Sequence, residues 1–91
     1  MSSAGPVDIL ISNRRGLHAR ASAKFVTLAS SFDAQVTVSH DGHSVPGTSI
    51  MGLMMLAAGP GDIISIAATG PQAEAALDRL QGLVMDKFGE D

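Results

Sequence analysis

A histidine and two basic residues at close spacing are the part of this chain best suited to chemistry. His18, Arg20 and Lys24 follow Gly16, which permits a tight turn, at the point where a helix is expected to begin. The first N–H groups of a helix lack helical partners and carry the positive end of its dipole, so this point favours an oxyanion or a phosphate. The backbone N–H groups of Ala19 and Arg20 would donate there, and the Arg20 guanidinium can bind phosphate oxygens in pairs.

Imidazole is the group whose chemistry this setting favours. Neutral histidine is available near physiological pH and is a competent nucleophile, and its attack on a phosphoryl donor forms a labile P–N bond. This chemistry predicts a phosphoryl carrier with His18 as acceptor and Arg20 as stabiliser, needing no cofactor. Two other interpretations stay open: a solvated histidine–arginine pair, and a small ligand-binding domain in which the pair grips an anion, for which the core leaves little room.

Length and composition limit the classes of protein and of binding site that this chain can form. A chain of 91 residues fits a single domain, 1–91, whose ends, 1–5 and 89–91, are expected to be loose. The absence of cysteine excludes a disulfide framework and a Cys-ligated metal site. His40 and His43 flank a turn with no further ligand nearby, so no metal site is predicted. With a net charge of -3 and no Trp or Tyr, nucleic-acid binding by base stacking is not expected.

Charge is divided unevenly along the chain. Residues 1–33 hold four basic residues against two acidic ones, whereas residues 34–91 hold two against seven. The basic N-terminal third would attract acidic partner surfaces. No signal peptide and no apolar stretch long enough for a bilayer is recognisable, which predicts a cytoplasmic protein without membrane insertion.

Hydrophobic periodicity places the chemistry on a small scaffold. Alternating patterns predict strands and stripes of period 3.6 predict helices, in the order β-α-β-β-α-β-α. The Asp41-Gly42 pair predicts a type I′ hairpin, and Thr69 or Gly70 is expected to cap the last helix. The fold class is α+β, a sheet with helices on one face. The predicted elements are strands at 7–12, 34–39, 44–46 and 64–68, and helices at 19–30, 50–57 and about 71–88.

The short helix at 50–57 is unusually rich in methionine. Thr48 and Ser49 are both good N-caps for it. Its methionines cannot all share one buried face with Ile50 and Leu53, so some must be exposed. Exposed methionine adapts to more than one partner, whereas Leu53 and Leu56 are expected to belong to the core.

Three segments of the chain resemble the HPr family, the phosphocarriers of the bacterial phosphoenolpyruvate-dependent phosphotransferase system. Residues 16–20 (GLHAR) resemble the family's active-site motif, residues 48–56 its regulatory-serine segment, and residues 61–70 its last strand. The resemblance covers about residues 6–88. It implies an open-faced β-sandwich, with an antiparallel sheet in the order 1-4-2-3 and three helices on one side.

The resemblance also implies roles and partners. His18 would accept a phosphoryl group from enzyme I at Nδ1 and pass it to an enzyme IIA component, of a sugar-transport or a nitrogen-type system, with Arg20 neutralising the group. Ser49 would be the site of an HPr kinase/phosphorylase. The docking surface would consist of Ile50, Met51, Met54 and the basic Lys24, on a monomer that is a carrier and not an enzyme.

Some positions depart from the family pattern. Ala21 stands where proline is common, which removes a constraint on the first helical turn, and Thr48 stands where lysine is common. Arg15 stands where a small polar residue is expected, which would alter the hydrogen bond that orients His18. The alternative function is a purely regulatory module of the same fold, controlled by phosphorylation of Ser49.

Overall fold

The structure is a computed structural model that describes residues 2–90. These residues form four strands, three α-helices and a final 3-10 turn, in the order β-α-β-β-α-β-α that the sequence predicts. The bounds are β1 Ser2–Leu10, α1 Ala19–Ser30, β2 Gln35–His40, β3 His43–Pro46, α2 Ile50–Met55, β4 Ile63–Gly70, α3 Ala73–Met85 and η1 Lys87–Gly89.

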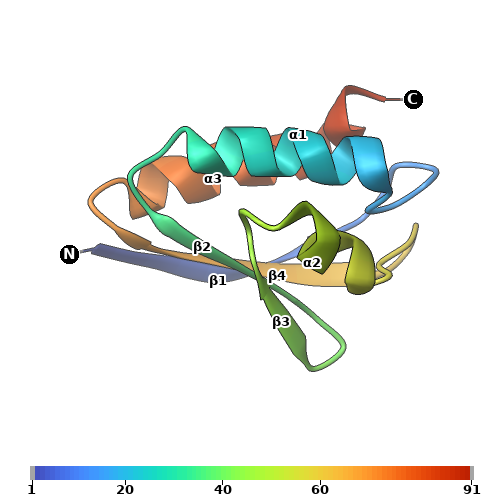
Figure 1. Ribbon diagram of the computed structural model, residues 1–91, viewed down its shortest axis with the longest axis horizontal. Helices are drawn as coiled ribbons and strands as arrows, with labels where there is room; N and C mark the ends of the chain where they lie inside the picture. The colour runs from blue at the N-terminus through green and yellow to red at the C-terminus, as the bar shows by residue number, and fades with distance from the viewer. Residues whose placement is uncertain (1, 91) are drawn as a thin grey trace.

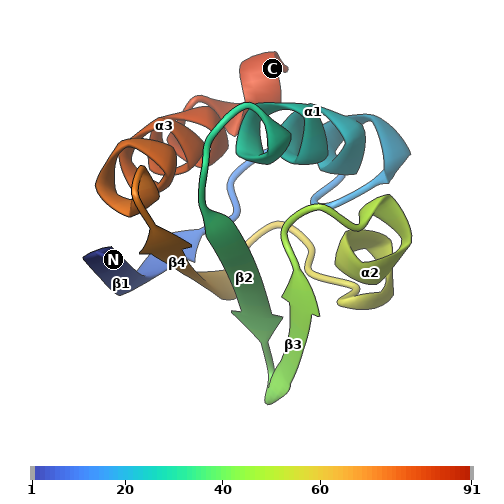
Figure 2. The ribbon, with the colours of Figure 1, turned by 60° about the vertical axis from the view of Figure 1, so that its left-hand side comes forward.

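The strands form one antiparallel sheet in the order β1-β4-β2-β3, which confirms the predicted topology. α1 and α3 lie side by side over one face, and α2 lies on the same side next to α1 (Figure 1). The other face carries no helix of the described chain (Figure 2). There the cross-strand partners Leu10 and Ile63 are exposed. The fold is therefore an α+β open-faced sandwich.

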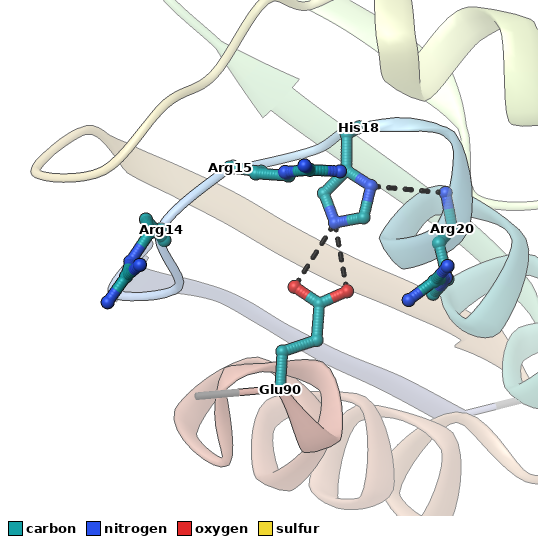
Figure 3. A pocket seen from close by; sticks show the side chains of 5 residues that line it. All are labelled: Arg14, Arg15, His18, Arg20 and Glu90. Atoms are coloured by element: carbon teal, nitrogen blue, oxygen red, sulfur yellow. Dashed lines mark hydrogen bonds and ion pairs between the residues drawn. The ribbon is translucent and has the colours of Figure 1, made fainter.

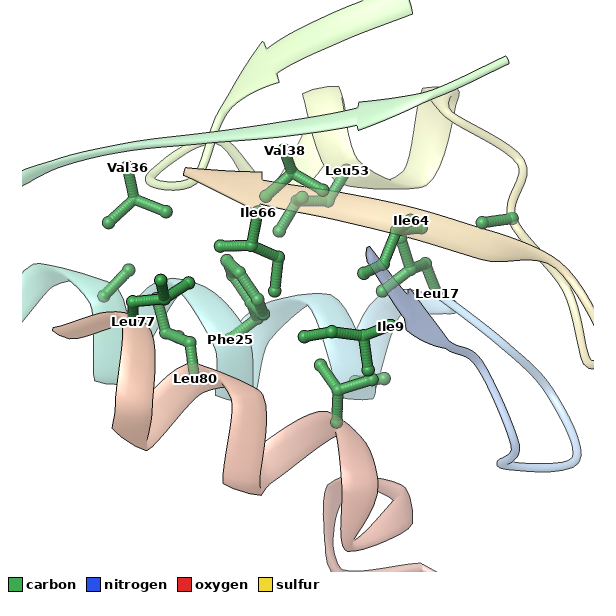
Figure 4. Close-up of a cluster of buried hydrophobic side chains, with 14 of the residues drawn as sticks. Ile9, Leu17, Phe25, Val36, Val38, Leu53, Ile64, Ile66, Leu77 and Leu80 are labelled. Carbon is green, nitrogen blue, oxygen red and sulfur yellow. The ribbon is translucent and has the colours of Figure 1, made fainter. Parts of the chain in front are cut away.

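Alternation along the strands and one buried residue on α1 explain how the two layers hold together. Ile9, Ile64 and Ile66 are buried and point toward the helices, as the period of two requires. Phe25 of α1 is fully buried between Ile66 of β4 and Leu80 of α3 (Figure 4). Burial of one such aromatic side chain stabilises the fold by about 1.5–3 kcal/mol. The core is otherwise aliphatic, as the composition predicts.

The first strand is longer than predicted. It begins at Ser2, which pairs with Gly70, and it contains an irregularity between Ala4 and Val7. Residues 2–5, expected to be loose, therefore belong to the sheet, because β4 extends to Gly70 and presents backbone groups along this edge that need partners. Residue 1 lies outside the described residues.

The C-terminal end also differs from the expectation. The last helix begins at Ala73 with Gln72 as N-cap, so neither Thr69 nor Gly70 caps it; both remain in β4. It ends at Met85, and the chain then forms η1, in which Phe88 is fully buried. Gly89 is part of this turn and not loose, because the buried Phe88 ring anchors the segment; residue 91 lies outside the described residues.

The β2–β3 hairpin turns as predicted and holds no metal cluster. Asp41 and Gly42 both have positive φ, which is the type I′ geometry. His40 lies 3.7 Å from Asp62, and no group of three potential metal ligands occurs within residues 2–90.

None of the helices within residues 2–90 has the length and apolar character needed to cross a membrane.

The turn before α1 is packed tightly against the loop that follows α2. Gly16 has φ +63°, and a Cβ there would lie 2.3 Å from the carbonyl oxygen of Ala58. The N–H of Leu17 donates to that same carbonyl at 3.0 Å. This contact sets where α1 begins, and it needs a residue without a side chain.

A glycine substitution tests this constraint. Gly16→Ala should lower the free energy of unfolding by more than about 1–2 kcal/mol, since the left-handed conformation alone costs that much and the Cβ also clashes. Gly82→Ala is the control, because a Cβ at this α3 position meets nothing within 4 Å, and it should stabilise by about 0.5–1 kcal/mol. Urea unfolding measures both, and equal effects would contradict the packing argument.

Candidate functional site

His18 is the N-cap of α1, which determines how one ring nitrogen is used. Its backbone is extended, with φ −74° and ψ 178°, and its carbonyl accepts from the N–H of Ser22 at 2.9 Å. The side chain bends back over the first turn, so that Nδ1 accepts from the backbone N–H of Arg20 at 3.3 Å. Nδ1 therefore presents a lone pair at the start of the helix.

Glu90 determines the state of the other ring nitrogen. Nε2 of His18 lies 2.9 Å from Oε2 and 3.1 Å from Oε1 of Glu90 (Figure 3). An ionised carboxylate only accepts hydrogen bonds, so Nε2 must be the donor. We assign the proton of the neutral ring to Nε2 on this basis, which leaves Nδ1 unprotonated.

Two further side chains hold Glu90 and the loop in place. Asn13 is fully buried, and its Nδ2 donates to the carbonyl of Gly16 at 2.8 Å and to Oε1 of Glu90 at 3.3 Å. Its Oδ1 has no hydrogen-bond partner among the described residues. Nζ of Lys24 donates to the carbonyl of Phe88 at 2.7 Å, which ties η1 to α1. The chain end thus lies against the start of α1, as Figures 1 and 2 show.

The charge state of Glu90 follows from these contacts. The hydrogen bond from His18 lowers the pKa of the Glu90 carboxyl below its ordinary value of 4.5. Burial acts in the opposite direction, while the hydrogen bond from Asn13 and the positive charge of Lys24 add to the lowering. The carboxylate is therefore ionised at neutral pH and ready to accept from the imidazole.

An open depression of about 390 Å³ surrounds the imidazole. It is lined by Arg14, Arg15, His18, Arg20 and Glu90. In Figure 3, Arg15 and Arg20 flank the His18 ring from two sides, while Arg14 points away from it. The two guanidinium groups beside the ring, Arg15 and Arg20, against the one carboxylate of Glu90 would favour an anion here. The structure thus brings His18 and Arg20 together as the sequence predicts.

Residues 48–56 form a second surface, separate from the depression around His18. Ser49 is the N-cap of α2, and its Oγ accepts from the N–H of Gly52 at 2.9 Å. Leu53 and Leu56 are buried, as expected. The remaining large side chains of the segment are exposed by 41% (Ile50), 70% (Met51), 40% (Met54) and 78% (Met55). The expected exposure of methionine on this helix is confirmed, while a docking role remains a prediction.

Sequence reasoning missed Glu90 and Asn13. Arg15 was expected to alter the hydrogen bond that orients His18, and the orienting partner of Nε2 is Glu90. Glu90 lies 72 residues away and carries no local signal. Asn13 has one weak signal, a polar residue placed just after an apolar strand. Lys24 uses one of its donors within the fold, and its predicted docking role stays a prediction.

Comparisons with known proteins agree on one family. The family described as "PTS HPr component phosphorylation site" matches residues 7–86. The phosphocarrier protein HPr of Cupriavidus necator is 48% identical over 91% of this chain and 93% of its own length. The phosphocarrier protein NPr of Shewanella violacea is 43% identical over 91% of each chain. The crystal structure of HPr-C-His from Thermoanaerobacter tengcongensis superposes with a TM-score of 0.90 at 41% identity, covering 100% of this chain and 99% of the other.

The lowered pKa of Glu90 makes the contact with His18 dependent on pH. Because folding lowers this pKa, the contact stabilises the folded chain fully above pH 4.5, and its contribution is lost as the pH falls through the lowered pKa. The difference in unfolding free energy between wild type and Glu90→Gln should therefore be present at neutral pH and vanish in acid. Urea unfolding across pH measures it.

The His18→Ala background is the control for this prediction. There the same Glu90→Gln substitution should change stability much less, because the largest cause of the pKa shift is gone. If the difference in unfolding free energy between wild type and Glu90→Gln stayed constant down to acid pH, it would contradict an ionised Glu90 in contact with His18.

Proposed function

This chain belongs to the HPr family of phosphotransferase-system phosphocarriers, and from that premise we propose that His18 carries the phosphoryl group at Nδ1. The family's role is to relay a phosphoryl group between enzyme I and enzyme II components, as a carrier and not as a catalytic enzyme. The observation that carries the assignment is the pair of ring contacts. Nε2 donates to Glu90, so the nucleophilic lone pair is on Nδ1, at the start of α1.

The transfer forms one bond and breaks one bond. The Nδ1 lone pair of His18 attacks the phosphorus carried by enzyme I, and the electron pair of the broken donor–phosphorus bond stays with the donor group. His18 keeps its proton on Nε2, so the phosphorylated ring is cationic and Glu90 remains hydrogen-bonded to it. No proton needs to leave the ring in this step. The reverse sequence, with the acceptor nucleophile attacking the phosphorus, releases the group.

The start of α1 receives the new negative charge. The N–H of Arg20, which donates to Nδ1 before transfer, becomes available to a phosphoryl oxygen when that lone pair forms the P–N bond. The N–H of Ala19 and the positive end of the helix dipole also stabilise the negative charge of the phosphoryl group. The Arg20 guanidinium, exposed beside His18, supplies a full charge and a planar pair of donors.

Docking is proposed to use the exposed face of α2. Ile50, Met51 and Met54 form an apolar surface on a helix that packs against α1, so one partner can cover both the apolar surface and the His18 site. Lys24 keeps two donors after bonding to Phe88 and contributes positive charge beside the site. We propose enzyme I as donor and an enzyme IIA component, of a sugar-transport or a nitrogen-type system, as acceptor, each meeting a monomer of this chain in the cytoplasm.

Incubation with phosphoenolpyruvate and enzyme I tests the carrier assignment. Wild type should acquire one acid-labile phosphoryl group, and His18→Ala should acquire none, because the nucleophile is absent. Arg20→Ala should slow the transfer by about tenfold or more with little loss of stability, since the side chain is exposed. Labelling and urea unfolding are the measurements. A wild-type protein that stays unlabelled in the presence of an active enzyme I would refute the proposal that His18 carries the phosphoryl group.

Ser49 is a candidate for regulatory phosphorylation. It is half-buried at the N-terminal end of the exposed apolar face, where its hydroxyl caps α2. A phosphate there would add about 1.5–2 negative charges at the edge of the apolar docking surface, and so would weaken docking without touching the His18 site. An HPr kinase/phosphorylase is the proposed modifying enzyme. In the alternative function, this event is the main role of the chain and His18 is little used.

A charge substitution separates docking from chemistry. Ser49→Asp keeps an N-capping oxygen and should raise the KM for phosphorylated enzyme I several-fold with little change in kcat, because only docking is altered. Ser49→Ala is the control: it should keep normal transfer kinetics while losing about 1 kcal/mol of stability with the cap. Steady-state transfer kinetics and urea unfolding measure these effects, and unchanged kinetics in Ser49→Asp would rule out this mode of control.

A further inference from the structure

Two consecutive arginines precede the site, and they are used differently. Arg14 and Arg15 both line the depression around His18. In Figure 3, the Arg15 side chain runs toward the imidazole, whereas the Arg14 side chain points away from it. Arg15 makes no hydrogen bond or ion pair within residues 2–90. Its guanidinium is therefore free to bind a group that arrives at His18.

The formal charges around His18 indicate that a further cation would be favourable in the phosphorylated state. After transfer, the ring carries one positive charge, the phosphoryl group about two negative charges, and Glu90 one more negative charge. The Arg20 guanidinium offsets only one of these. Lys24 also acts on Glu90, but its Nζ is held at the Phe88 carbonyl and does not line the depression. An excess negative charge therefore remains among the ring, the phosphoryl group, Glu90 and Arg20. Glu90, which orients the ring through Nε2, also repels the phosphoryl group, so the hydrogen bond that selects Nδ1 carries an electrostatic cost.

We propose that Arg15 is a second phosphoryl-binding residue, placed across the imidazole from Arg20, and that its charge offsets that of Glu90 in the phosphorylated state. The inference rests on the proposed function of His18. A guanidinium is suited to this role because its planar donors match the geometry of phosphoryl oxygens. With Arg15 included, the formal charges of the ring, phosphoryl group, Glu90 and the two arginines sum to about zero.

The role proposed for Arg15 predicts an effect on the phosphorylation equilibrium of His18 more than on the binding of enzyme I. A cation that contacts the phosphoryl group stabilises the phosphorylated carrier over the free one. It should therefore change the phosphoenolpyruvate-to-pyruvate ratio at which half of the protein is phosphorylated. With catalytic amounts of enzyme I, this ratio does not depend on how tightly enzyme I binds. Because Arg15 is exposed, its contribution should also decrease as salt screens the charges.

Adjacent substitutions provide a matched test. Arg15→Gln should require a phosphoenolpyruvate-to-pyruvate ratio roughly three- to fivefold higher than wild type, the scale of an exposed ion pair. Arg14→Gln removes the same charge one residue away and should have a much smaller effect. Arg15→Lys keeps the charge without the planar fork and should recover part of the loss. Phosphorus NMR of the phosphohistidine signal measures the phosphorylated fraction at low and high salt.

The outcomes separate the two proposals. A wild-type protein that shows no phosphohistidine signal would refute the carrier function of His18 itself. A wild-type protein that is phosphorylated normally, with Arg15→Gln and Arg14→Gln giving the same ratio, would refute the role of Arg15 alone. Urea unfolding of each variant establishes that the fold is unchanged, as the exposure of both side chains requires.

Discussion

The hydrogen bond between Nε2 of His18 and the carboxylate of Glu90 is the contact on which the site depends. An imidazole has two ring nitrogens of similar basicity, and only the one without a proton can attack. By accepting from Nε2, the carboxylate leaves the lone pair on Nδ1, where the backbone N–H of Arg20 already points. The nucleophile and the positive helix end thus face the same space.

That contact exists because the C-terminal turn η1 is held against α1. The Gly16 turn before α1 packs closely against the carbonyl of Ala58, and this packing positions the turn that leads to His18. Phe88 of η1 is fully buried, and Lys24 of α1 donates to its carbonyl. Packing of the chain end therefore serves the chemistry, because it holds a carboxylate within hydrogen-bonding distance of the ring.

The proposed reaction site and the proposed docking surface lie on adjacent helices. The basic residues of the N-terminal third gather around His18, while the exposed apolar side chains lie on α2, which packs against α1. A chain almost free of aromatic residues has few large anchors for an interface, so in the proposed docking mode flexible methionines would provide the contact area. Such a surface can adapt to partners of different shape, which suits a carrier that must meet a donor and an acceptor in turn.

Local patterns in the sequence determined most of the scaffold and the core of the site. The alternating strands, the Asp41-Gly42 turn, the capping position of Ser49 and the GLHAR segment are all encoded by residues close together, since strand and helix periodicity and turn chemistry act over a few positions. The tertiary structure alone decided that Ser2 pairs with Gly70 and that the last helix begins at Ala73. It also decided that the Glu90 carboxylate lies against Nε2 of His18 and leaves Nδ1 as the unprotonated nitrogen. These contacts join residues up to 72 positions apart, and their formation depends on how the whole sheet and its helices pack rather than on any neighbouring residue.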